Sequence, residues 1–117
     1  MAKIFFRDTS DFISLAPNRG GCFASDRITV DGRKVGYMYR EKPDDQIWDN
    51  GWRFFAGDES DDYVNDPSNL GIYDVNTIAN YDPEITQYLD APFGSAFERR
   101  PNGFVAVEFE HSDSKDF

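Results

Sequence analysis

The 117-residue sequence predicts one small α+β domain, with an antiparallel sheet built from two hairpins plus a central strand, and two or three short helices. The predicted order of elements is hairpin, strand, small helices and hairpin, which favours this class over a regularly alternating α/β fold. Aromatic residues make up 16% of the chain, enough apolar surface for one core. We therefore expect a single domain over residues 1–117, in which the acidic tail 111–117 is frayed.

The first hairpin is predicted around an Asp-Gly pair. Residues 28–30 form one arm and residues 33–40 the other, with Asp31 and Gly32 between them. Such a pair tolerates the positive φ angles of a type I′ turn, whose twist matches that of the flanking strands. A further short strand is expected over residues 21–25, before this hairpin.

The central strand and the second hairpin follow from the same kind of pattern. Residues 50–57 form an aromatic segment that is bounded by glycines, which is typical of a short buried strand. The second hairpin joins residues 95–100 to residues 104–109 across a Pro-Asn-Gly turn at 101–103.

Short helices are predicted from their capping residues. Asp74 caps a turn over residues 75–79, in which the apolar side chains fall on one side. Asp82 precedes Pro83, a pairing that is typical of the first positions of a helix. A third helix is expected over residues 10–16, where the following proline ends it.

Charge is unevenly distributed along the chain, whose net charge is -10. Residues 1–56 hold nine basic and eight acidic side chains, whereas residues 57–117 hold three basic and fourteen acidic ones. Such an acidic surface repels nucleic-acid phosphates and anionic membranes, and it attracts basic proteins or cations. We therefore expect no nucleic-acid or membrane partner. The alternative is that the acidity serves only to keep the protein in solution.

Histidine and cysteine chemistry is disfavoured. His111 is the sole histidine and lies in the acidic tail, where a catalytic base would not be oriented. Cys22 is the sole cysteine, so neither an internal disulfide nor a thiolate metal cluster forms. We expect Cys22 to be a small core side chain on a strand, and we expect no catalytic residue and no cofactor.

The acidic loop over residues 57–63 has two interpretations that involve a ligand. Asp58, Ser60 and Asp62 have the alternate spacing of a calcium loop. However, Tyr63 replaces the required glycine and Asn69 replaces the required glutamate, so an EF-hand is excluded. A small divalent-cation-binding or metal-dependent hydrolytic domain that uses this loop stays open as the alternative function.

The other interpretation is a surface that binds a protein partner. The loop directly follows aromatic residues, and aromatic anchors with complementary charge are the usual elements of an interface. The predicted partner-binding residues are Trp52, Phe54, Asp58, Glu59, Asp61, Asp62, Tyr63, Tyr73, Asp74, Tyr81 and Asp82. The alternative is a solvated loop after a core strand, with Trp52 and Phe54 buried.

No targeting segment is expected. The apolar run near the N-terminus has three residues, too few for a signal peptide, and no stretch approaches the roughly 18 apolar residues of a membrane span. We therefore expect the protein in the cytoplasm.

Most of the chain resembles the bacterial immunity-protein-33-like family, also called domain of unknown function 2185. The resemblance covers about residues 20–100, and its segments are 22–32, 34–41, 51–59, 69–78, 80–83 and 94–99. It implies a cytoplasmic antidote of a polymorphic toxin system that binds a toxin and blocks it, without catalytic residues. The acidic half of the chain is consistent with a partner of one kind, a basic toxin domain that attacks nucleic acid. Carboxylates can bind the basic side chains of such a domain in place of phosphates.

Overall fold

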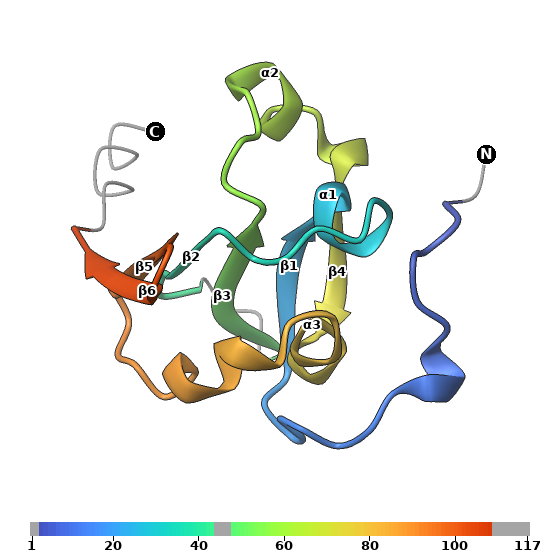
Figure 1. Ribbon diagram of the computed structural model, residues 1–117, viewed down its shortest axis with the longest axis horizontal. Helices are drawn as coiled ribbons and strands as arrows, with labels where there is room; N and C mark the ends of the chain where they lie inside the picture. The colour runs from blue at the N-terminus through green and yellow to red at the C-terminus, as the bar shows by residue number, and fades with distance from the viewer. Residues whose placement is uncertain (1–2, 44–47, 109–117) are drawn as a thin grey trace.

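In the computed structural model, which describes residues 3–43 and 48–108, a six-stranded mixed sheet carries short helices on one face (Figure 1). The strands are β1 (Gly21–Ser25), β2 (Tyr37–Arg40), β3 (Asp49–Phe55), β4 (Leu70–Asp74), β5 (Ala96–Arg100) and β6 (Gly103–Val107). Their order across the sheet is β4-β1-β3-β2-β5-β6. The α+β prediction is confirmed. The sheet is not wholly antiparallel, because β3 lies beside β1 and runs parallel to it.

The described part of the chain also contains short helical segments. These are η1 (Thr9–Asp11), α1 (Asp26–Thr29), α2 (Asp61–Val64), η2 (Pro67–Asn69), α3 (Val75–Tyr81) and η3 (Pro83–Tyr88). Buried side chains of α1, α3 and η3 pack against the sheet face that carries the core. By contrast, α2 stands beyond one end of the sheet, at the top of Figure 1.

Several predicted elements are confirmed. The expected strand over residues 21–25 is β1, the central strand is β3, and the second hairpin is β5 with β6. The predicted helix starts are also confirmed: Asp74 accepts the N–H of Asn76 at the start of α3, and Asp82 caps η3. Position 109 of the hairpin and the predicted tail 111–117 lie outside the described residues.

The predicted hairpin around Asp31 and Gly32 is wrong. Residues 26–29 form α1 instead, because the Ser25 hydroxyl accepts the N–H of Arg27 and so caps a helix. Gly32 has a positive φ of 81°, and its N–H donates to the carbonyl of Ile28 at 3.1 Å. The Asp-Gly pair therefore ends a helical turn, a role that also requires a positive φ. The expected second arm contributes β2, which pairs with β3 and β5.

The helix predicted over residues 10–16 is also wrong, apart from the single turn η1. The backbone of this segment bonds to side chains of α3 instead of to itself. The N–H groups of Leu15 and Ala16 donate to the Asn76 side chain, and that of Ile13 donates to Asn80. These bonds satisfy backbone N–H groups of a non-helical segment that lies against α3.

The core lies between the helices and one face of the sheet. Trp52 and Phe54 on β3 are completely buried, and their rings stack with centroids 5.8 Å apart. The Trp52 indole N–H donates to the carbonyl of Leu89 at 3.2 Å, so the polar end of the side chain is also satisfied. Cys22 is buried in the same core as expected.

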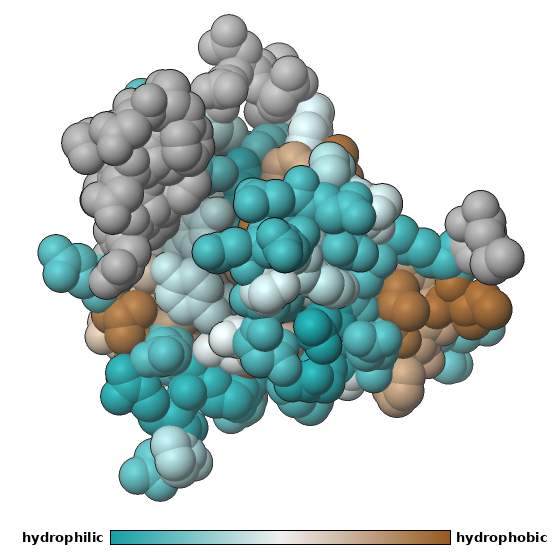
Figure 2. Space-filling model, turned by 90° about the horizontal axis from the view of Figure 1, so that it is seen from above, coloured by the Kyte–Doolittle hydropathy of each residue, from teal (hydrophilic) through white to brown (hydrophobic). Residues whose placement is uncertain are grey.

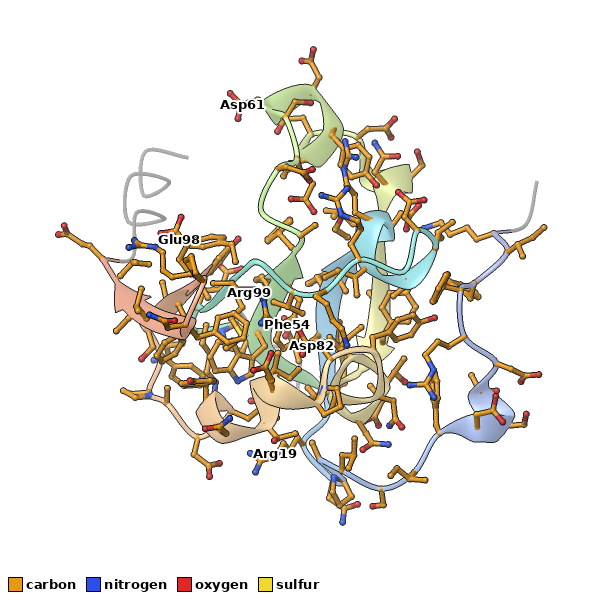
Figure 3. All side chains as sticks on the ribbon, in the orientation of Figure 1. Arg19, Phe54, Asp61, Asp82, Glu98 and Arg99 are labelled. Atoms are coloured by element: carbon orange, nitrogen blue, oxygen red, sulfur yellow. The ribbon has the colours of Figure 1, made fainter. Side chains whose placement is uncertain are left out.

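One carboxylate inside the domain connects three separate segments. Asp82 is 1% exposed, and its Oδ2 accepts the N–H of Val35 at 3.0 Å and a guanidinium N–H of Arg99 at 2.5 Å. Its Oδ1 accepts the N–H of Glu84 at 3.2 Å. Arg99 also donates to the carbonyl of Val35. The start of η3, the segment before β2, and β5 are thereby fixed to one another, and Figure 3 shows Asp82 and Arg99 near the centre of the fold.

We predict that Asp82→Ala lowers the free energy of unfolding by about 2–4 kcal/mol, because it leaves the Val35 N–H and the Arg99 guanidinium without their acceptor. Urea denaturation followed by tryptophan fluorescence measures the change. Asp90→Ala is the control, because it removes an 88% exposed carboxylate that pairs with Arg19. Its denaturation midpoint should equal that of the wild type. Equal midpoints for the wild type and Asp82→Ala would contradict the role of this carboxylate.

Candidate functional site

The acidic loop after β3 is held in place by its own hydrogen bonds. Gly57 has a positive φ of 105°, and the Glu59 carboxylate accepts the N–H groups of Ala56 at 2.7 Å and Gly57 at 2.9 Å. The Ser60 hydroxyl then accepts the N–H of Tyr63 and caps α2. The chain therefore turns sharply away from the sheet before α2 begins.

Beyond this turn, α2 presents carboxylates to solvent. Asp61 and Asp62 are exposed in its first turn, and in Figure 3 Asp61 projects from the end of the molecule. Viewed from that end, Figure 2 shows a largely hydrophilic surface, with an apolar patch beside the N-terminal segment. In the N-terminal segment, Ile4, Phe5 and Phe6 are exposed.

Asp58 has a different environment, because it pairs with two arginines. It accepts from Arg33 at 2.6 Å and lies 3.5 Å from Arg27. The hydrogen bond from Arg33 lowers the pKa of Asp58 below its ordinary value of 3.8. The guanidinium of Arg27 also lies over the Tyr63 ring, 4.8 Å from its centroid. Asp58 and Tyr63 therefore join the acidic loop to the α1 region.

A hollow of about 600 Å³ lies beside the acidic loop, on the sheet face away from the core. Tyr37 and Tyr39 of β2 and Phe55 of β3 line it, and their side chains are half-buried. The rings of Tyr39 and Phe55 stack with centroids 6.1 Å apart, and those of Tyr37 and Tyr39 lie 5.8 Å apart. Asp58, Glu59 and Glu98 also line the hollow. We call this feature the aromatic hollow.

The same face of the sheet carries a buried arginine. Arg53 donates to both carboxylate oxygens of Asp49 at 2.9 Å and to Glu41 at 2.7 Å. Its guanidinium lies 4.6 Å from the centroid of the Phe23 ring. Burial opposes ionisation of Asp49, but hydrogen bonds from Arg53 and from the Gly51 N–H outweigh it and lower the pKa of Asp49 below 3.8. This ion pair is complete within the chain, so its role is structural.

Four of the predicted partner-binding residues lie inside the folded domain. Trp52 and Phe54 are 0% exposed, Asp82 is 1% exposed and Tyr81 is 8% exposed. The Tyr81 hydroxyl donates to the carbonyl of Thr29 at 3.0 Å. Because a partner cannot reach these side chains without unfolding the protein, we remove them from the candidate surface.

Tyr73 and Asp74 are separated from the acidic loop. Both lie at the end of β4 that leads into α3, whereas α2 stands at the opposite end of the sheet (Figure 1). The Tyr73 hydroxyl bonds to Thr29, and Asp74 caps α3. The structure thus brings five of the predicted residues together. We call them the acidic surface: Asp58, Glu59, Asp61, Asp62 and Tyr63.

The aromatic hollow was not among the predicted features. Tyr37 and Tyr39 do alternate in sequence with the buried Met38, so their pattern indicates that they share one side of a strand. The pattern does not say which side faces a core. That depends on the pairing of β2 with β3, which places Met38 opposite the buried Phe54.

Metal-binding and membrane-spanning features are not found in the described part of the chain. Over residues 3–43 and 48–108, no group of three His, Cys, Asp or Glu side chains is arranged to hold a metal ion. No helix in these ranges is long and apolar enough to cross a membrane. Burial raises the pKa of the Cys22 thiol, which disfavours the nucleophilic thiolate. His111 lies outside the described residues.

The fold and surface define a small α+β domain with an acidic projection beside an aromatic hollow. The family model of the immunity protein Imm33 domain matches residues 22–108, which include the whole acidic surface and all of the sheet except Gly21, the first residue of β1. The chain therefore belongs to the Imm33 immunity protein family, and membership implies toxin neutralisation. Comparisons with curated proteins and with solved structures gave no match.

The Asp49 ion pair predicts a pH dependence of stability. Because the pKa of Asp49 is lower in the folded protein, its contribution is complete above the unfolded value of 3.8 and is lost as pH falls through the folded value. Asp49→Asn should therefore be less stable than the wild type at pH 7, and the difference should shrink toward about pH 2. Urea denaturation over this pH range measures it. A difference that stays constant with pH would contradict the assignment.

Proposed function

We propose that this protein neutralises a toxin in the cytoplasm by binding it through the acidic surface, and that the toxin presents a basic face. The observation that carries the proposal is the placement of Asp61 and Asp62 on α2, exposed and beyond the end of the sheet. Carboxylates in this position are accessible to a partner protein. Family membership supplies the class of partner.

The distribution of charge supports a basic partner. No Lys or Arg occurs in the sequence between Arg53 and Arg99, while ten carboxylates do. Asp61 and Asp62 form no ion pair with another described residue, so their charge is available to a partner. Complementary charge of this kind accelerates association and selects against wrong partners.

Neutralisation by this route needs no catalytic group on the immunity protein. A toxin that acts on nucleic acid must bind phosphates, and it does so with basic side chains. Carboxylates that occupy those side chains block access of the nucleic acid. The Glu59 and Ser60 hydrogen bonds fix the start of α2, so less conformational entropy is lost when the partner binds.

The test is capture of a partner by the tagged protein from lysate of the source bacterium, followed by a binding assay with the purified partner. We predict that the double variant Asp61→Lys with Asp62→Lys weakens binding at least about tenfold, and that the remaining affinity depends less on salt. The matched control is Asp8→Lys with Asp11→Lys, which makes the same change in net charge on the exposed turn of η1.

Binding by the control variant should equal that of the wild type. Equal weakening by both double variants would mean that only the net charge matters, and it would contradict the proposed surface. Loss of growth protection in cells that express the captured toxin with the Asp61 and Asp62 variant, but not with the control, would link the surface to neutralisation.

A further inference from the structure

We infer that two copies of this chain associate through the outer edge of β6, with the two β6 strands paired antiparallel about a two-fold axis. The sheet then continues from one copy into the other. The inference is independent of the proposed function, because β6 is the last strand of the sheet and carries no residue of the acidic surface. In Figure 1, β6 lies at the left of the molecule, whereas α2 stands at the top.

The outer edge of β6 presents unpaired backbone groups. Arg99 lies opposite Phe104 in the β5–β6 register, but its N–H donates to the carbonyl of Gly36 at 2.8 Å, on the β2 side of β5. Arg99 and Phe104 are therefore a non-hydrogen-bonded pair, in which the backbone groups of Phe104 point away from β5. The same holds for Ala106, two residues along. Within residues 3–43 and 48–108, no group donates to or accepts from the N–H and C=O of these two residues.

The strand lacks the features that commonly prevent two sheet edges from pairing. Such edges are protected by charged side chains, prolines or bulges, whereas β6 is Gly-Phe-Val-Ala-Val and keeps a regular register with β5. Val105 is 39% exposed, and Ala106 is also exposed. The Phe104 ring packs against Tyr88, with centroids 5.4 Å apart, and so holds the strand in place.

The opposite edge of the sheet is protected by the chain itself. The Lys3 ammonium donates to the carbonyl of Leu70 on β4 at 3.3 Å, and the Phe5 ring packs edge-on against Tyr73 of the same strand. A head-to-tail contact of β6 with β4 would have to displace this segment. It would also leave a free edge on each new copy and continue into a filament, whereas a two-fold pair of β6 strands closes.

One register of the two β6 strands satisfies all of the outward groups. With the two-fold axis at Val105, Phe104 of each copy lies opposite Ala106 of the other copy, and each such pair exchanges two backbone hydrogen bonds. Val105 then faces its own counterpart in a non-hydrogen-bonded pair, where apolar branched side chains pack closely. At the ends, Glu108 comes opposite Asn102 of the other copy, so no two like charges meet directly.

Charge favours a second copy over the basic partner of the proposed function. A basic face needs carboxylates, and β6 has none. The net charge of -10 opposes association in general, but the nearest charged side chains on β5, Glu98 and Arg100, pair with each other at 2.6 Å. A neutral strand with the same unpaired backbone groups is the complement of this edge. Because one strand pair buries little area, we expect a weak dimer whose population rises with concentration.

Sedimentation velocity of the full-length protein from about 1 μM to about 1 mM tests the association. We expect a monomer–dimer equilibrium. Val105→Lys should raise the dissociation constant of the dimer at least about tenfold, because two ammonium groups then meet at the axis. The matched control is Ile72→Lys, which makes the same change of charge at a 59% exposed side chain on β4. It should dimerise like the wild type.

Three results of this measurement would overturn the inference. They are a wild type that stays monomeric over the whole range, growth into species larger than a dimer, and equal weakening by Val105→Lys and Ile72→Lys. Thermal melts verify that both lysine variants are folded, so loss of the dimer is not mistaken for loss of the domain.

Cross-linking through new cysteines tests the register. Val105→Cys places two thiols on Cα atoms about 4.5 Å apart across the axis, within reach of a disulfide. Val107→Cys is the matched control on the same side of the strand, because its counterpart is offset by roughly 13 Å along the strands. Cys22 is buried in both variants. After oxidation with diamide, non-reducing electrophoresis should show a covalent dimer for Val105→Cys only. Equal cross-linking of the two variants, or none of Val105→Cys, would contradict the paired strands.

Two further measurements separate this inference from the proposed function. The double variant Asp61→Lys with Asp62→Lys should dimerise at least as well as the wild type, even if it no longer binds the toxin. If no toxin is captured but the dimer forms as described, the β6 interface stands and the proposed function is wrong. If the chain stays monomeric alone and Val105→Lys weakens toxin binding, the edge takes a strand of the toxin and the inference of a second copy is wrong.

Discussion

The relative placement of the sheet and the helices depends on the hydrogen bonds of one buried carboxylate, that of Asp82. It accepts one hydrogen bond from Glu84 in its own turn and two from segments farther away in sequence, at Val35 and Arg99. A carboxylate is removed from water only when such partners replace the solvent, so the three segments are positioned together or not at all. The fixed start of η3 places its buried Ile85 in the same core as Trp52 and Phe54. The strand that carries these rings also leads into the acidic loop, which links the core to the candidate site.

Side chains alternate along β2 and β3, so the two faces of the sheet have different surroundings. Met38 and Phe54 point into the core, whereas Tyr39 and Phe55 line the aromatic hollow on the other side. Packing of the core face holds β2 and β3 in place. These strands in turn hold the rings on the opposite face. The strands hold the rings in a fixed arrangement, and the acidic loop is held by the hydrogen bond from the backbone of Ala56 to Glu59.

Local signals predicted most of the elements, and tertiary contacts account for what they missed. The capping carboxylates Asp74 and Asp82 were recognised because their partners lie two residues away in the chain. The Asp-Gly pair at Asp31 was misread because a hairpin and a helix end share the same positive φ. The non-helical course of residues 12–16 depends on Asn76 and Asn80, more than sixty residues away. The charge pattern of the sequence predicted the acidic loop. The pattern did not reveal that Trp52 and Phe54, which precede the loop, are buried in the core.

The parallel pairing of β1 with β3 has a consequence for the order in which the chain folds. Between these strands in sequence lies β2, and β3 lies between β1 and β2 in the sheet, while β4 pairs with the other edge of β1. Contacts of such long sequence separation form slowly, because the intervening chain must first be closed into a loop. We therefore expect the pairs that β1 makes with β3 and β4 to form later than the β5–β6 hairpin, whose strands are neighbours in sequence.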